Sequence, residues 1–256
     1  MFRNYAIAGL SIVALAASGS PAEAQPFKNT GATLAATDPD WSVSVRRLVG
    51  GTYTEFQPNA TRITTIPSAP WNPNSAPSFS WIGLRSNGTL PLAGVSGDNV
   101  MRFEYLFRTT VFMPTAGTVS GLIGFDNRFL GAYVGGTVSP GFVFSGGTMV
   151  LSPTTLLGAG NENRFGFCRN GDGMFAGSAF PNCTKAYAFN LDAGFNTLTF
   201  VLRGDGQTDG LLMNGTTGGS VVPEPATMVL FGTGMLGLAL VARRARADER
   251  TGGQAV

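Results

Sequence analysis

The chain has 256 residues and a formal net charge of +2, with two cysteines and no histidine. Without histidine it cannot by itself supply a Ser-His-Asp or Cys-His catalytic apparatus or the usual catalytic zinc site. Residues 25–222, which lie between two distinctive ends, carry 12 basic and 11 acidic side chains. This near-neutral balance gives no reason to expect a nucleic acid partner.

The N-terminal end has the features of a secretory signal. Arg3 supplies a positive charge, residues 5–17 are apolar, and Ala22-Glu23-Ala24 is a small-x-small cleavage site. The pattern predicts a signal peptide over residues 1–24, which directs the chain to the Sec translocon and is removed before Gln25.

Apolar and polar residues alternate through much of residues 25–213, which is the period of a strand. In residues 101–111, Met101, Phe103, Tyr105 and Phe107 share one face, and Arg102, Glu104 and Arg108 the other. Further strands are predicted at 41–45, 62–66, 80–83, 119–125, 129–134, 187–191 and 197–203. Glycine-rich turns separate them, and only residues 152–157 favour a helical turn. We therefore predict a single all-β domain, a jelly-roll-like β-sandwich.

The two cysteines, Cys168 and Cys183, both lie in the part predicted to be exported. An even pair in an oxidising compartment favours a disulfide that closes the intervening loop. The alternative is a nucleophilic thiol, which no histidine of this chain could activate.

Asp205-Gly206-Gln207-Thr208-Asp209-Gly210 begins like a calcium loop, but Thr216 stands where the bidentate glutamate would be needed. A hairpin turn before residues 211–213 explains the same residues, so we expect no metal or cofactor, and calcium binding there stays open.

Two further groups are candidates for contact with carbohydrate. Asp126 could pair with Glu104, Glu162 or Asp172 as the two carboxylates of a glycosidase, or Asp126 and Asn127 could be turn-capping groups. Of the tryptophans, Trp41 and Trp81 lie in strand patterns and are expected to be buried. Trp71 lies between Pro70 and Pro73 in a loop and is the better surface candidate. Trp71, Asp126 and Asn127 are thus the candidate sugar contacts.

The C-terminal end resembles a membrane-retained tail. After a linker at 214–222, Val222-Pro223-Glu224-Pro225 precedes an uncharged apolar stretch over residues 226–242, and Arg243, Arg244 and Arg246 follow at once. The stretch is long enough for a short transmembrane helix, although a buried helix of a globular domain is the alternative. The arginines predict that its C-terminal end is cytoplasmic, and hence that the body lies outside.

The segment from Val222 to Arg246 resembles the PEP-CTERM sorting signal of Gram-negative bacteria, in which a Pro-Glu-Pro motif precedes a transmembrane helix and an arginine-rich end. On this resemblance residues 223–250 form the sorting tail. The resemblance implies recognition by an exosortase, cleavage near Pro223-Glu224-Pro225, and transfer from the inner membrane to the cell surface or its exopolysaccharide layer.

The body has a looser resemblance to jelly-roll domains related to galactose-binding modules. It is carried by Asp40-Trp41, Trp81-Ile82-Gly83, the strand ending at Phe112, Phe125-Asp126-Asn127 and Phe195 to Phe200. Two features depart from that pattern, namely Tyr133-Val134-Gly135-Gly136 and an insertion expected over residues 145–185. These observations predict a non-catalytic surface or matrix protein that contacts exopolysaccharide, with a carbohydrate-active enzyme as the alternative.

Overall fold

The computed structural model describes residues 27–31, 36–64, 80–92, 100–126, 128–160, 184–207 and 209–218. The predicted signal peptide, both cysteines and the predicted sorting tail lie outside these residues. Within them the structure is almost entirely β, and its one helix is the five-residue α1 (Pro153–Leu157). Ser152 caps α1 by accepting a hydrogen bond from the Thr155 N–H, which confirms the predicted helical turn.

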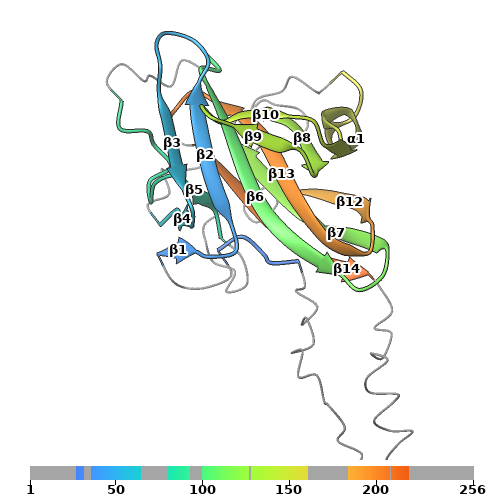
Figure 1. Ribbon diagram of the computed structural model, residues 1–256. Coiled ribbons are helices and arrows are strands. Elements are labelled where there is room, and N and C mark those ends of the chain that lie inside the picture. Colours follow the sequence, from blue (N-terminus) through green and yellow to red (C-terminus); the bar gives the residue numbers. More distant parts are fainter. Residues whose placement is uncertain are drawn as a thin grey trace, which may run out of the picture.

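Two antiparallel six-stranded sheets make up the body (Figure 1). Sheet A has the order β1 (Thr37–Asp38), β4 (Ala60–Arg62), β5 (Ile82–Gly83), β14 (Gly210–Gly218), β7 (Gly117–Asp126), β12 (Lys185–Leu191). Sheet B has the order β11 (Thr148–Leu151), β8 (Arg128–Val134), β13 (Gly194–Gly204), β6 (Phe103–Met113), β2 (Ser42–Arg47), β3 (Thr54–Gln57). A separate hairpin joins β9 (Thr137–Ser139) to β10 (Val143–Ser145).

The two sheets share one hydrophobic core, as in a β-sandwich. Val43, Phe107 and Phe200 of sheet B are buried in the same cluster as Ile123 and Leu211 of sheet A. Trp41 and Trp81 belong to this cluster and are at most 2% exposed, which confirms that both are buried. The predicted inward face of residues 101–111 is also confirmed, because Phe103, Tyr105 and Phe107 are at most 1% exposed.

Short connections carry the chain from one sheet to the other. β6 in sheet B is followed by β7 in sheet A after three residues, and β12 in sheet A by β13 in sheet B after two. The turn at Asp205–Asp209 is of the same kind. The predicted hairpin between the Phe200 strand and residues 211–213 is therefore wrong, because β13 pairs with β6 and β8, whereas β14 pairs with β5 and β7.

The expected insertion over residues 145–185 also needs correction at its start. β11 pairs with β8 from Thr148 to Leu151 and forms an edge of sheet B, and Leu156 and Leu157 of α1 are buried in the core. These residues are therefore part of the sandwich, because their apolar side chains complete its core.

Candidate functional site

The outer face of sheet B, which points away from the core, is crossed by the β9–β10 hairpin. We call residues 137–145 the strap. Phe142 at its tip stacks on Phe56 of β3, with ring centroids 5.9 Å apart, and Phe144 contacts Tyr133 of β8 at 5.1 Å. Because β13, β6 and β2 lie between β8 and β3 in the sheet, the strap passes over all three. Figure 1 shows β9 and β10 in front of sheet B.

Glycine pairs at both ends of the strap allow the chain to turn back over the sheet. The φ angles of these glycines lie between 72° and 81°, a region that is unfavourable for residues with a Cβ. They are Gly135, Gly136, Gly146 and Gly147. Phe142 is the one residue other than glycine with positive φ among those described, at 57°. Its aromatic stacking on Phe56 offsets part of the strain at that position.

Beneath the strap lies a row of side chains that the strand alternation predicts to be solvent-exposed. Ser44, Leu106 and Val201 are aligned across β2, β6 and β13, and all are at most 6% exposed. The strap explains this burial, because it covers a row that would otherwise place a leucine and a valine in water.

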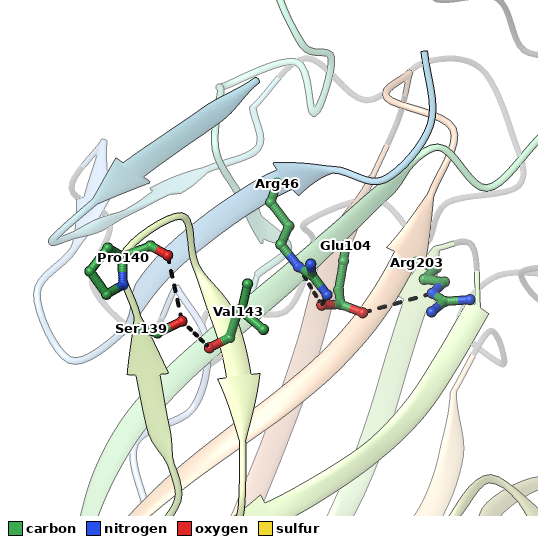
Figure 2. Close-up of polar contacts among 6 residues, drawn as sticks. All are labelled: Arg46, Glu104, Ser139, Pro140, Val143 and Arg203. Atoms are coloured by element: carbon green, nitrogen blue, oxygen red, sulfur yellow. Dashed lines mark hydrogen bonds and ion pairs between the residues drawn. The ribbon is translucent and has the colours of Figure 1, made fainter. Parts of the chain in front are cut away.

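A row of charged residues follows on the same face (Figure 2). Arg46 donates from Nε and Nη2 to Oε1 of Glu104, at 2.8 and 2.6 Å, and Arg203 Nε lies 3.8 Å from Oε2 of Glu104. Arg128 is paired in register with Arg203. Glu104 is 7% exposed and has arginines on both sides whose side chains are 26% and 39% exposed, so its arrangement is that of a partly buried ion pair. Burial, and secondarily the charge of Glu104, raises the pKa of the neighbouring Tyr133.

Beyond the strap, β6 and β13 continue as a two-stranded ribbon with an open outer surface. Pairing of β2 with β6 ends at Arg108, whereas β6 and β13 stay paired to Met113 and Gly194. Thr110 faces Thr197 across the ribbon, and Phe112 faces Phe195. The two phenyl rings have centroids 4.9 Å apart, and Phe195 is 69% exposed. A pair of aromatic rings is thus presented to solvent.

A polar pocket of about 500 Å³ opens at the inner end of this ribbon, where β2 begins. Its lining includes Asp40, Ser42, Arg108, Thr110 and Thr197. Arg108 makes one hydrogen bond within the described residues, from Nε to Thr199 Oγ1 at 3.3 Å, which leaves its terminal NH₂ groups for a ligand. The pocket, which Thr109 also lines, therefore offers a cation, a carboxylate and four hydroxyl groups, which suits a polyhydroxylated molecule.

In the calcium-like loop, both aspartates accept hydrogen bonds from groups of the protein. Asp209 Oδ2 accepts from Tyr105 Oη at 2.6 Å and from the Gly206 N–H at 2.7 Å, and Asp205 Oδ1 accepts from the Gln207 N–H at 2.9 Å. Burial, the largest effect, together with the charges of Asp205 and Asp126, raises the pKa of Asp209 well above its ordinary value. Within the described residues, no group of three or more acidic, histidine or cysteine side chains is arranged to hold a metal.

Of the three predicted sugar contacts, Asp126 alone lies within the described residues. Asp126 ends β7, on sheet A, and its proposed partner Glu104 lies on the outer face of sheet B in ion pairs with arginines. Trp71, Asn127, Glu162 and Asp172 lie outside the described residues, as do Cys168 and Cys183.

Sequence reasoning missed the aromatic pair and the pocket. A signal was present, because Phe112 and Phe195 are large apolar residues on the polar face of their strands. Only the strand register shows that they are neighbours, since 83 positions separate them in the chain.

Residues 221–245 match the family model of the PEP-CTERM protein-sorting motif. The motif implies an exported, membrane-anchored precursor with an exosortase as its processing partner. Comparison with curated proteins and with solved structures returned no significant match. No helix among the described residues is long and apolar enough to cross a membrane, and the span predicted at 226–242 lies outside them.

Proposed function

We propose that this protein is an exported, non-catalytic component of the cell surface or extracellular matrix, which an exosortase releases from an inner-membrane precursor and which contacts exopolysaccharide. The observation that carries the proposal is the sorting motif at residues 221–245. The secretory pattern at residues 1–24 supports it, because export through the Sec translocon places the body on the outer side of the membrane.

The arrangement of the body suits delivery by a C-terminal tail. Its N-terminal segment lies beside β14, the last strand: Thr30 N–H donates to Met213 O at 2.9 Å, and Gly215 N–H donates to Asn29 Oδ1 at 2.8 Å. The cleaved leader and the sorting tail would therefore attach at neighbouring points of the sandwich. The two-sheet architecture is compatible with a jelly roll of the galactose-binding type, which we retain as part of the proposal.

The absence of catalysis is proposed from the placement of the carboxylates. Glu104 is held between Arg46 and Arg203, and Asp209 is enclosed by Tyr105 and Gly206. Neither arrangement leaves an accessible acid beside an accessible nucleophile, as glycoside hydrolysis requires. Hydrolysis of a polysaccharide by the full chain, abolished by Asp126→Asn, would instead establish the enzymatic alternative.

Processing of the tail tests the proposal directly. In the producing cell, we expect mass spectrometry of the surface fraction to find a mature C-terminus that lacks Arg250. Replacing Pro223-Glu224-Pro225 by three alanines should keep the protein in the inner membrane with Arg250 intact, while Asp248→Asn in the same tail serves as the matched control. A cytosolic protein with its leader attached would overturn the proposal.

A further inference from the structure

We propose that the open outer surface of the β6–β13 ribbon, together with the pocket at its inner end, binds a neutral polysaccharide chain. We call this surface the ribbon face and define it by Phe112, Phe195, Thr110, Thr197, Arg108 and Asp40. The inference rests on the proposed function, since it names where and to what class of glycan the exported body binds.

The aromatic end of the ribbon face supplies apolar contact. Phe195 is 69% exposed, and Phe112 holds it at a centroid distance of 4.9 Å with the ring planes inclined by 53°. A phenyl ring fixed in this way stacks on the C–H face of a pyranose at a low cost in side-chain entropy, because its partner already restricts it.

The middle and inner end of the ribbon face supply hydrogen bonds. Thr110 and Thr197 are paired across the ribbon, two positions from Phe112 and Phe195 in their strands, and both line the pocket. Arg108 offers donors and Asp40 offers carboxylate acceptors, and both line the pocket with Ser42. Phe112 lies four positions after Arg108 in β6, which is about 14 Å along a strand. This length exceeds one sugar ring, so the occupant is a chain.

Charge indicates that this chain is neutral. Asp40 balances Arg108 in the pocket, and the threonines and phenylalanines are uncharged, so an acidic sugar would gain one attraction and meet one repulsion. Arg46 and Arg203 could attract an acidic glycan, but both are paired with Glu104. They are separated from Arg108 by the row of Ser44, Leu106 and Val201, which the strap covers. The ribbon face therefore has no excess positive charge for a uronate.

Affinity electrophoresis of the full chain tests the inference, with hydroxyethylcellulose and galactomannan as neutral probes and alginate as an acidic one. We expect at least one neutral probe to retard the protein and alginate not to. Phe195→Ala should weaken retardation at least tenfold, and adding Arg108→Gln should abolish it. The matched control is Leu122→Ala on the outer face of sheet A, where the side chain is 38% exposed, and it should change binding by less than twofold.

Thermal unfolding of each variant shows whether it is folded, and Phe195→Ala should stay folded with a small decrease in melting temperature, because it loses the ring contact with Phe112. Failure of both neutral probes, retardation by alginate alone, or an equal effect of Leu122→Ala would overturn the inference. None of these results touches the export and processing that the proposed function requires, whose failure would appear separately as loss of the wild-type protein from the surface fraction.

Discussion

Asp209 shows how one buried carboxylate can set the pH response of the body. It lies at 1% exposure beneath the crossing from β13 to β14, where it accepts hydrogen bonds from Tyr105 and Gly206. Burial penalises the ionised form more than these hydrogen bonds favour it, so the pKa of Asp209 is raised in the folded protein. The native state thus holds this proton to higher pH than the unfolded chain does.

The direction of the pH dependence follows from linkage. The contribution of Asp209 to stability is fully present below the unfolded pKa of about 3.9 and is lost as the pH rises from there through the raised folded pKa. We expect Asp209→Asn to remove this decline in the free energy of unfolding with rising pH. Urea unfolding at a series of pH values would measure it. Asp192→Asn, at an exposed position, is the matched control, and a decline that persists in Asp209→Asn would show that another group causes it.

The strap is the element whose position decides which part of sheet B is exposed. Two aromatic contacts join it to sheet B, Phe142 on Phe56 and Phe144 on Tyr133. Its legs end in the glycine pairs at 135–136 and 146–147, so its own backbone restrains it weakly. These ring contacts therefore contribute to holding the strap on sheet B.

A double-mutant cycle measures that docking. Aromatic pairs contribute about 1 kcal/mol beyond the area they bury, so Phe56→Ala and Phe142→Ala should show a coupling free energy of about that size in urea unfolding. The same cycle with Phe56→Ala and Leu122→Ala, which lie on different sheets, should give no coupling. Additive effects of the Phe56 and Phe142 substitutions would mean that the strap is not docked in solution.

At the scale of the element, the sequence predicts the main strands but not how they are connected. Of the strands predicted from alternation, those around Phe103, Phe125, Phe129 and Phe200 are all present, with ends shifted by a few residues. The turn at Asp205–Asp209 was predicted as a hairpin, whereas the chain crosses between sheets there. A glycine-rich turn of this length is compatible with both, because the choice depends on which strands the flanking residues pair with.

At the scale of the whole molecule, the sandwich is combined with a C-terminal protein-sorting motif and with an N-terminal segment predicted to be a secretory signal. The match at residues 221–245 agrees with the motif, apolar stretch and basic end predicted from the sequence. The predicted disulfide between Cys168 and Cys183 would add stability to the exported state, and it stays a prediction because both residues lie outside the described ones.

Export through an oxidising compartment leads to a measurable expectation for these cysteines. Protein from the surface fraction should show no thiol that reacts with iodoacetamide until a reductant is added. Replacing both cysteines by serine should lower the free energy of unfolding by about 3 kcal/mol, the chain-entropy value for a loop of this length. Two reactive thiols in the native, unreduced protein would contradict the pairing.

The sequence by itself determined the β class, the inward faces of the main strands, the burial of Trp41 and Trp81, and the sorting tail. Each is a local property, since a period of two or an apolar run before arginines is read within one segment. The tertiary structure alone decided that the strap covers Leu106 and Val201, that Glu104 lies between arginines, and that Phe112 meets Phe195 beside a polar pocket. These features depend on register between strands far apart in the chain, and register is set by how two whole sheets bury their common core.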